Sequence, residues 1–269
     1  MKDRWLIVSH ERSGTEWLIA SIIKNIHPHL FQRNAGRQIS WDLDGGRLYD
    51  PKVMEQVLWC DIRDRVKPIF DCGGRTMARG TDPHVPVKSH HAFDFFEPLW
   101  GKIIEDFNVI YLMRDGRDVM CSMWNHGWDH EGFMPKAFNP TQFCRLPPTE
   151  EMGRYHGDYH AVDMATRWSH HMGSWHGREG VLYVSYEQLT LSYNQTMHTI
   201  AGFAGLDIPV EIESPELTGI RPWRGKVGNW ENFGDQNDWV FFNLAAGQGM
   251  WILKEHNGKH FLMENPSEN

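Results

Sequence analysis

The feature that most constrains the fold is a short apolar run that leads through a polar loop into a helical pattern. The run is Trp5–Val8, the loop segment is Ser9–Trp17, and apolar residues then recur at helical spacing. A loop that enters a helix N-terminus presents free backbone N–H groups and the positive end of the helix dipole. The sequence therefore predicts a strand–loop–helix unit whose loop is suited to phosphate or sulfate.

Side chains in this loop add to its suitability for an anion. Gly14 allows close approach of the backbone, and Arg12 adds a positive charge. Ser13 and Thr15 supply hydroxyl donors, although either residue could instead be an ordinary helix N-cap. The loop is not a Walker A sequence, because the pattern GxxxxGK[ST] is absent.

Short apolar runs bounded by structure breakers favour a parallel sheet. Ile69–Phe70 is a candidate for a fifth strand beside four clearer ones. The four clearer runs are Trp5–Val8, Val85–Lys88, Val109–Met113 and Val181–Ser185. Because helical patterns alternate with these runs, we expect an α/β fold with three αβα layers around a central, mainly parallel sheet. The length suits a single domain over residues 1–269.

Three apolar stripes at helical spacing lie between or after the strands. The first begins at Trp17, and the third is followed by Gly205 at a plausible C′ position. The second stripe comprises Val162, Ala165, Trp168, Met172 and Trp175, and the third comprises Tyr193, Met197, Ile200, Ala201 and Ala204. Residues 32–82 and 124–160 show weak periodicity, so we expect lids or binding loops there, with disorder as the alternative.

Composition limits the classes of partner. The net charge of −8 opposes a general nucleic-acid or anionic-membrane binder. No apolar run approaches the roughly 18 residues that span a bilayer. The start, Met1–Val8, is too short and too charged for a secretory signal, so we expect a cytoplasmic protein. The cysteines form no CxxC pair, and we expect free thiols in a reducing compartment.

The anion loop resembles that of the PAPS-dependent sulfotransferases (PAPS is 3′-phosphoadenosine 5′-phosphosulfate), whose loop commonly reads PKSGTTW. The segment here reads ERSGTEW, with Arg12 at the position of the family's Lys. The resemblance implies a P-loop-like nucleotide-binding core in which Ser13, Gly14 and Thr15 bind the donor and Trp17 stacks on the adenine. Two residues depart from the family pattern. They are Glu11, in place of Pro, and Glu16, in place of a Thr that helps to hold the 5′-phosphate. The resemblance thus makes Glu16, like Arg12, a candidate for contact with the donor.

A second segment, Tyr111–Ser122, resembles the family pattern YxxRxxxDxxxS. The resemblance implies that Arg114 and Ser122 hold the 3′-phosphate of the donor. Asp118 is then expected to be structural, as a helix cap or as the partner of a nearby arginine. Two such motifs in the right order, each at the end of a strand, are more specific than either motif alone.

Two further motifs complete the predicted donor site. The segment Val184–Leu189 resembles KYEDL, which places Tyr186 near the adenine. The segment Trp223–Trp230 resembles the family's RKGxxGDW loop, which places Arg224 and Gly225 over the 3′-phosphate. Trp223 stands where the family has its first basic residue, and either Lys226 or Arg221 is a candidate to replace that charge.

The reacting centre is predicted at the end of the second strand. Val85–His90 resembles the family's KTH segment, in which the His is the general base, so His90 is our candidate. His91 is the rival on chemistry alone, because neighbours in a strand point to opposite faces. Negative charge develops on the bridging oxygen of the leaving group, and Arg12 is the expected cation there, with Lys88 assisting.

The resemblance implies transfer of a sulfuryl group from PAPS to a small-molecule hydroxyl or amine by an in-line reaction. No metal is required, because a sulfuryl group carries less charge than a phosphoryl group. The histidine pairs His126/His130 and His156/His160 do not lie in an HExxH pattern. The alternatives are a P-loop-type kinase or NTPase, and a non-catalytic carbohydrate-binding module that uses its many Trp side chains.

The acceptor pocket is expected where the resemblance fades. Three aromatic residues follow the predicted 3′-phosphate motif directly, namely Trp124, Trp128 and Phe133. Aromatic side chains there suit an apolar slot for a planar acceptor such as a phenol, and packing of a lid is the alternative.

Overall fold

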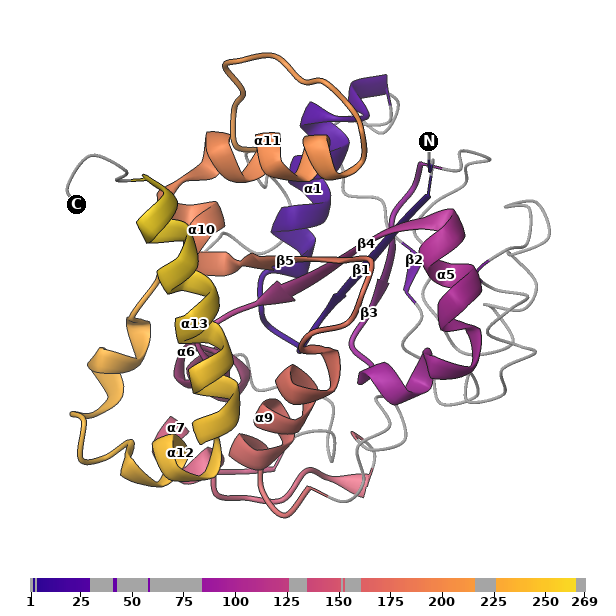
Figure 1. Cartoon of the computed structure of the whole chain (residues 1–269). Coiled ribbons are helices and arrows are strands. Elements are labelled where there is room, and N and C mark those ends of the chain that lie inside the picture. The colour runs from indigo at the N-terminus through magenta and orange to yellow at the C-terminus, as the bar shows by residue number, and fades with distance from the viewer. Residues whose placement is uncertain are drawn as a thin grey trace.

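The protein is built around a five-stranded parallel sheet with the strand order β2-β3-β1-β4-β5 (Figure 1). The computed structural model describes residues 2, 4–29, 41–42, 58, 84–125, 135–150, 152, 161–215 and 226–264. The strands are β1 (Arg4–Ser9), β2 (Trp41–Asp42), β3 (Val87–Ser89), β4 (Phe107–Met113) and β5 (Val181–Ser185). Every described strand pair is parallel. The four clear strands predicted from the sequence are confirmed.

The fifth strand differs from the candidate that the sequence suggested. It is β2, which pairs with β3 through Trp41 and Val87. A strand of two residues is too short to produce a recognisable apolar run, which is why the sequence did not reveal it. Ile69–Phe70 lies outside the described residues.

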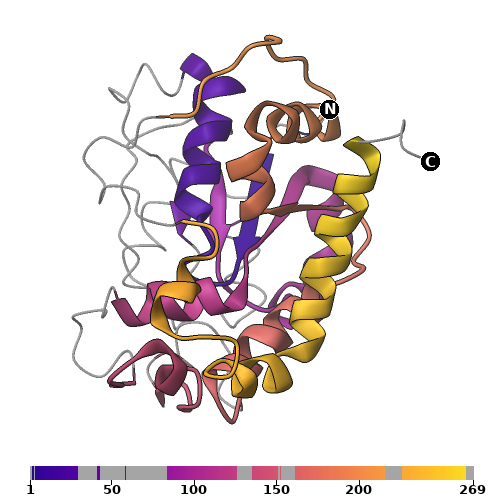
Figure 2. The same ribbon diagram turned by 90° about the vertical axis from the view of Figure 1, so that its left-hand side faces the viewer.

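Helices cover both faces of the sheet, so the three-layer αβα prediction is confirmed. In Figure 2, α1 (Thr15–Asn25) and α13 (Gly247–Glu264) lie on opposite sides of the strands. The other helices are α5 (Trp100–Asp106), α6 (Gly116–Asn125), α7 (Pro140–Phe143), α9 (Met164–Trp175), α10 (Tyr186–Leu191), α11 (Tyr193–Phe203) and α12 (Val240–Ala245). Short 3₁₀ helices occur at η1 (Phe93–Phe95), η2 (Glu97–Leu99) and η3 (Asn229–Phe233).

The predicted helical stripes correspond to α1, α9 and α11. Val162 is the exception, because it precedes α9 and is 74% exposed, while the Asp163 side chain caps that helix. Helix α11 ends as predicted, with Gly205 in the left-handed region at φ 70°. The Leu206 N–H donates to the carbonyl of Ala201 at 2.9 Å, as in a Schellman motif.

The longest helix, α13, had no recognisable pattern in the sequence. It packs against α9, and Gly249 is the closest point of that contact. A Cβ atom on Gly249 would lie 2.6 Å from the ring of Trp168, and the Gly249 N–H donates to Ser169 Oγ at 3.0 Å. Glycine at this position permits the close approach of the two helices but also weakens the helical signal.

The topology directs the predicted functional segments to one edge of the sheet. From β1 the chain moves to one side to form β2 and β3, and then to the other side to form β4 and β5. Residues that follow the carboxyl ends of β1, β3, β4 and β5 therefore meet at a topological switch point, where α/β sheets bind ligands. Every described donor-site and base candidate from the sequence lies near this edge.

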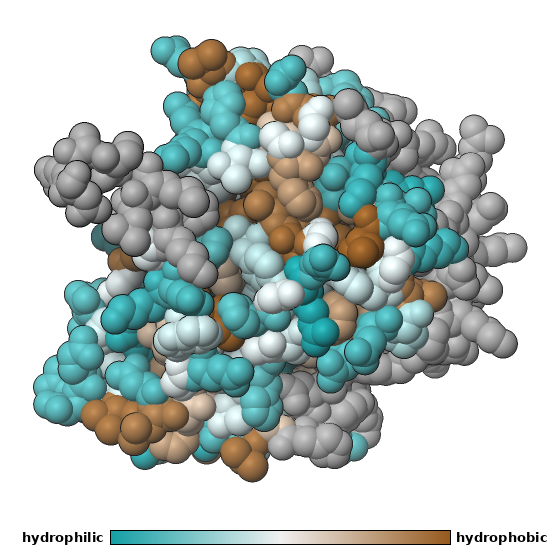
Figure 3. Space-filling model, in the orientation of Figure 1, coloured by the Kyte–Doolittle hydropathy of each residue, from teal (hydrophilic) through white to brown (hydrophobic). Residues whose placement is uncertain are grey.

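The described helices include none that is both long and apolar enough to cross a bilayer. On the face of the molecule in Figure 3, hydrophilic residues predominate and apolar ones form several separate groups. Cys121 and Cys144 are buried free thiols, in agreement with the prediction, whereas Cys60 and Cys72 lie outside the described residues.

Candidate functional site

The loop between β1 and α1 keeps hydrogen-bond donors available for a ligand. Gly14, at φ 96°, is the N-cap residue of α1, and no side chain caps this helix. Thr15 Oγ1 hydrogen-bonds instead to Ser9 Oγ at 2.5 Å. Ser13 Oγ is buried and has no hydrogen-bond partner within the described part of the chain. The alternative that Ser13 or Thr15 is an ordinary helix cap is therefore wrong.

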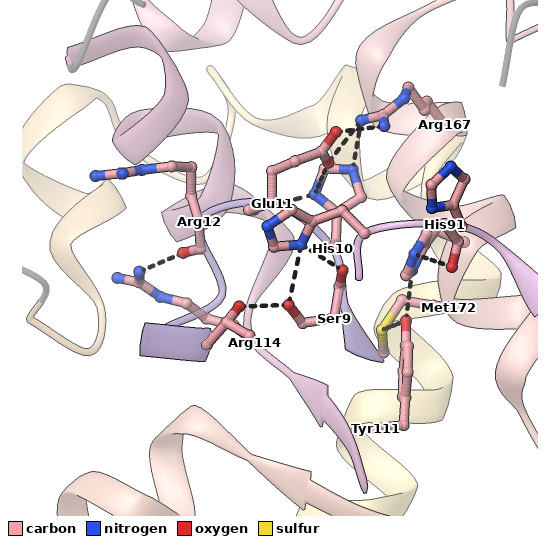
Figure 4. Close-up of polar contacts among 12 residues, drawn as sticks. Ser9, His10, Glu11, Arg12, His91, Tyr111, Arg114, Arg167 and Met172 are labelled. Carbon is pink, nitrogen blue, oxygen red and sulfur yellow. Dashed lines mark hydrogen bonds and ion pairs between the residues drawn. The ribbon is translucent and has the colours of Figure 1, made fainter. Parts of the chain in front are cut away.

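Arg12 connects this loop to the predicted 3′-phosphate motif. Its Nε donates to Ser122 Oγ at 3.2 Å. Its carbonyl accepts from Arg114 Nη1 at 2.9 Å (Figure 4). Arg12 has φ 64° and is the sole non-glycine residue of the described segments with positive φ. The fold thus brings Arg12 to Arg114 and Ser122, which lie 102 and 110 residues farther along the chain.

Arg114 is buried, and the described part of the protein does not satisfy all of its hydrogen-bond donors. It is 4% exposed, and its Cζ lies 4.3 Å from the centroid of the Tyr186 ring. Its Nε has no hydrogen-bond partner among the residues that the structure describes. A buried, unpaired donor on a charged group costs free energy unless something binds it.

The predicted adenine residues lie beside Arg114. The Trp17 ring meets Tyr186 edge-on at 5.7 Å between centroids and stacks on Tyr193 at 5.9 Å. Trp17 Nε1 donates to Ser214 Oγ at 3.2 Å. Trp17 and Tyr186, which the sequence assigned to one ligand, are thus in contact with each other, and Tyr186 is also in contact with Arg114.

Asp118 has the structural role expected of it. Its carboxylate accepts hydrogen bonds from the backbone N–H groups of Gly228 and Trp230, both at 2.9 Å. This ties the start of η3 to α6, which also carries Ser122. Arg224 and Gly225, with Arg221 and Trp223, lie outside the described residues, and Lys226 is exposed.

His90 has the geometry of an oriented base. Its Nδ1 lies 2.9 Å from the carbonyl oxygen of Ser9 and 3.3 Å from Ser9 Oγ. A carbonyl only accepts, so Nδ1 carries the hydrogen and Nε2 carries the lone pair. The rival, His91, is fully buried and stacks on Phe95 at 3.9 Å. Its Nδ1 bonds to Ser89 Oγ at 2.8 Å, which favours a packing role.

Lys88 faces Glu16, the residue that stands where the family loop has a Thr. Their Nζ and Oε1 atoms are 3.8 Å apart, with the Glu16 side chain half exposed and that of Lys88 mostly buried. The ion pair offsets part of the negative charge that Glu16 adds to the anion loop. The donor-binding role of Glu16 and the catalytic role of Lys88 stay predictions.

Sequence reasoning missed a buried polar network beneath the anion loop. Glu11 forms two hydrogen bonds with Arg167, and His10 contacts both residues. His171 Nδ1 lies 2.8 Å from the Tyr111 hydroxyl. Burial lowers the pKa of His171 and raises the pKa of Tyr111. The signal in the sequence was Glu11, an acidic residue where the family has Pro, but its partner lies 156 residues away.

The predicted acceptor slot is described only at Trp124. This residue packs edge-on against Phe233 at 5.5 Å and donates to the Ala137 carbonyl at 3.0 Å. Trp128 and Phe133 lie outside the described residues, as do the two histidine pairs considered for metal. Within the described segments, no group of three or more His, Cys, Asp or Glu side chains is placed to hold a metal ion.

Comparisons with known proteins identify the family of the chain. Residues 2–218 match the family model described as "Sulfotransferase domain". Human sulfotransferase 2B1 is 22% identical over 211 residues, which is 76% of this chain and 46% of the relative. The chain thus spans about half the length of this curated relative.

Two solved structures resemble the fold. Retinol dehydratase in a complex with retinol and PAP has a TM-score of 0.59 at 16% identity, covering 93% of this chain and 82% of that one. Mouse sulfotransferase SULT7A1 complexed with PAP has a TM-score of 0.57 at 15% identity, covering 93% and 86%.

Proposed function

The chain belongs to the sulfotransferase domain family, and we propose that it transfers a sulfuryl group from PAPS to a hydroxyl or amine of a small molecule. One observation carries this proposal. Arg12, Arg114 and Ser122 meet at the carboxyl edge of the sheet. Arg114 Nε and the Oγ atom of Ser13, the residue after Arg12, are buried donors that lack partners in the described part of the chain. Such donors fit an anionic ligand.

The residues present fit PAPS in charge and in hydrogen-bond donors. The loop of Ser13 and Gly14 would hold the 5′-phosphosulfate at the N-terminus of α1. Arg114 and Ser122 would hold the 3′-phosphate, and Trp17 would lie against the adenine. Solved relatives of similar fold were crystallised with PAP, the product that PAPS leaves after transfer, and this supports the same donor here.

The proposed reaction has His90 as the general base. Nε2 of His90 takes the proton of the acceptor O–H or N–H as that atom attacks sulfur. The bond from the acceptor atom to sulfur forms, while the bond from sulfur to the bridging oxygen of the 5′-phosphate breaks. The electron pair of the broken bond stays on that oxygen, so PAP leaves as the product. Arg12, assisted by Lys88, would stabilise the developing negative charge.

The acceptor is proposed to be a small organic molecule, with a phenol among the candidates. The solved relatives include complexes with retinol and with androsterone, both of which are small molecules. For the compartment we propose the reducing cytoplasm, which fits the buried free thiols of Cys121 and Cys144. Burial raises the pKa of the Cys144 thiol to about 12, so this thiol is unreactive at neutral pH.

Incubation with PAPS and a mixed panel of phenols, alcohols, sugars and amines tests the proposal. We expect mass spectrometry to find products that gain one sulfuryl group, and we expect PAP to bind more tightly than AMP. Turnover of ATP with Mg²⁺ in the absence of sulfuryl transfer would instead support a kinase or NTPase. Sugar binding without any turnover would support a carbohydrate-binding module.

A further inference from the structure

Helix α9 directs three polar side chains toward the candidate site. Arg167, His171 and Trp175 are spaced by four residues and therefore lie on one face of the helix. Arg167 reaches Glu11 of the anion loop (Figure 4). His171 Nε2 and Trp175 Nε1 each lie 3.1 Å from the carbonyl oxygen of His91. One helix face thus contacts both the segment that contains Arg12 and the segment that contains His90.

The contact with the anion loop is a two-pronged ion pair. Arg167 Nη1 lies 2.9 Å from Glu11 Oε2, and Arg167 Nη2 lies 2.6 Å from Glu11 Oε1. Both side chains are 1% exposed. Two parallel hydrogen bonds between a planar guanidinium and a carboxylate fix orientation as well as distance.

His10 makes this arrangement more rigid. Its Nε2 lies 2.9 Å from Arg167 Nη1, and a guanidinium only donates, so Nε2 accepts. The hydrogen is therefore on Nδ1, which lies 3.1 Å from both the carbonyl oxygen and Oε2 of Glu11. His10 is thus a neutral bridge between the two charged side chains, and all three are buried.

Arg12, the next residue in the chain, has a backbone conformation that needs such support. A non-glycine residue at φ 64° is strained, and strain of this kind persists only where neighbouring contacts hold it. On one side of Arg12, Glu11 is fastened to α9. On the other side, the Arg12 carbonyl accepts a hydrogen bond from Arg114.

We propose that Glu11 and Arg167 are positioning residues that hold Arg12 in its left-handed conformation and set its separation from His90. The pair acts on the reaction through Arg12, whose conformation shapes the loop proposed to hold the phosphosulfate and whose Nε donates to Ser122 Oγ in the structure. Helix α9 also positions the segment that contains His90, because His171 and Trp175 both contact the carbonyl oxygen of His91. This inference rests on the proposed function and adds to it the reason that an acidic residue stands at position 11.

The substitution Arg167→Lys tests the geometry while it keeps the charge. A lysine cannot reproduce the two parallel hydrogen bonds. We expect kcat to fall roughly 10–100-fold, because a small misplacement of a catalytic group has effects of that size. The Kd for PAP should change less than about fivefold, since the substitution alters none of the side chains proposed to contact its 3′-phosphate and adenine. Arg178→Lys, three residues after α9 and bonded to the Ser174 carbonyl, is the matched control and should leave kcat within about twofold of wild type.

A double-mutant cycle separates positioning from simple structural support. If Arg167 acts through Arg12, then Arg167→Lys should lower kcat less than about threefold when Arg12 is already Ala. Full additivity of the two losses would overturn the inference, as would an unchanged kcat in Arg167→Lys itself.

A second variant tests the inference if Arg167→Lys folds poorly. Glu11→Gln combined with Arg167→Met removes both charges and leaves no unpaired buried ion. We expect this variant to fold and to show the same loss of kcat, whereas wild-type kcat in it would contradict the inference. Failure of the wild type to bind PAP or to transfer a sulfuryl group would instead be a failure of the proposed function.

Discussion

The ring of His90 is fixed by the backbone of Ser9, whose carbonyl oxygen lies 2.9 Å from His90 Nδ1. Ser9 is the last residue of β1, and His90 directly follows β3, which pairs with β1. The sheet itself therefore sets the position and the tautomer of the candidate base. An imidazole held in this way contacts Ser9 through Nδ1 and not through Nε2, as the proposed role of Nε2 as the base requires.

Replacement of His90 by Ala should lower turnover by about 10²–10⁴-fold, because it removes the general base. The Kd for PAP should change little, since His90 lies outside the residues proposed to bind the nucleotide. Steady-state kinetics with PAPS and titration with PAP measure the two effects. His176→Ala, an exposed histidine just after α9, is the control. Near-normal turnover in His90→Ala would end its assignment as the base.

Asp118 is predicted to stabilise the fold by holding the segment 228–230. Asp118→Ala removes both hydrogen bonds to backbone N–H groups and should lower the free energy of unfolding by about 2–4 kcal/mol. Thermal unfolding should then show a Tm lower by roughly 4–10 °C. Asp118→Asn keeps one acceptor oxygen and should lose about half as much.

Asp235 offers a matched control for this experiment. Its exposed carboxylate also accepts hydrogen bonds from backbone N–H groups, those of Asn237 and Asp238. Water can replace these bonds, so Asp235→Ala should change Tm by less than about 3 °C. Equal decreases of Tm in Asp118→Ala and Asp235→Ala would show that the hydrogen bonds of Asp118 to segment 228–230 stabilise the fold no more than exposed ones do.

Much of the sheet and of the donor site could be predicted from the sequence, because both depend on local patterns. Buried parallel strands such as Val109–Met113 are continuous apolar runs, and the motifs containing Arg12 and Arg114 directly follow two of them. Since parallel strands end at one edge, motif order was enough to bring these residues together.

The network beneath the loop could not be predicted in the same way. Glu11 and Arg167 meet only because α9 packs against the residues that follow β1 and β3, and no local pattern encodes that contact. Helix α13 was missed for a related reason. Gly249 permits close packing against Trp168, and together with Gly247 and Gly258 it conceals the helix in the sequence.

Glu187 should make stability depend on pH. Burial raises the pKa of its carboxyl to about 7, while the unfolded value is about 4.3. The folded state therefore binds the proton more tightly, so this contribution to stability is complete below about pH 4 and is lost as pH rises through 7. Glu187→Gln cannot ionise, and its amide oxygen can still accept from the Asp115 N–H, which lies 3.0 Å from Glu187 Oε1.

Relative to wild type, Glu187→Gln should gain roughly 3–8 °C in Tm between pH 5 and pH 8. Thermal unfolding across that range measures the difference. Glu179→Gln, at an exposed position, should show a Tm difference from wild type that does not vary with pH. A constant difference for Glu187→Gln as well would contradict the assignment of a raised pKa to this carboxyl.

Arg114 should distinguish PAP from nucleotides that lack a 3′-phosphate. Its Nε has no partner among the described residues, and Arg12 contacts both Arg114 and Ser122. This arrangement suits the 3′-phosphate. A hydrogen bond to a charged group contributes about 1.5–3 kcal/mol. Arg114→Ala should therefore weaken PAP binding by roughly 10–150-fold while it barely changes AMP binding. Both nucleotides are titrated into wild type and variant at one salt concentration, because screening alters such contacts. Arg145→Ala, at an exposed arginine, is the control. A variant equally weakened for PAP and AMP, or a wild type that binds both alike, would show that Arg114 does not read the 3′-phosphate.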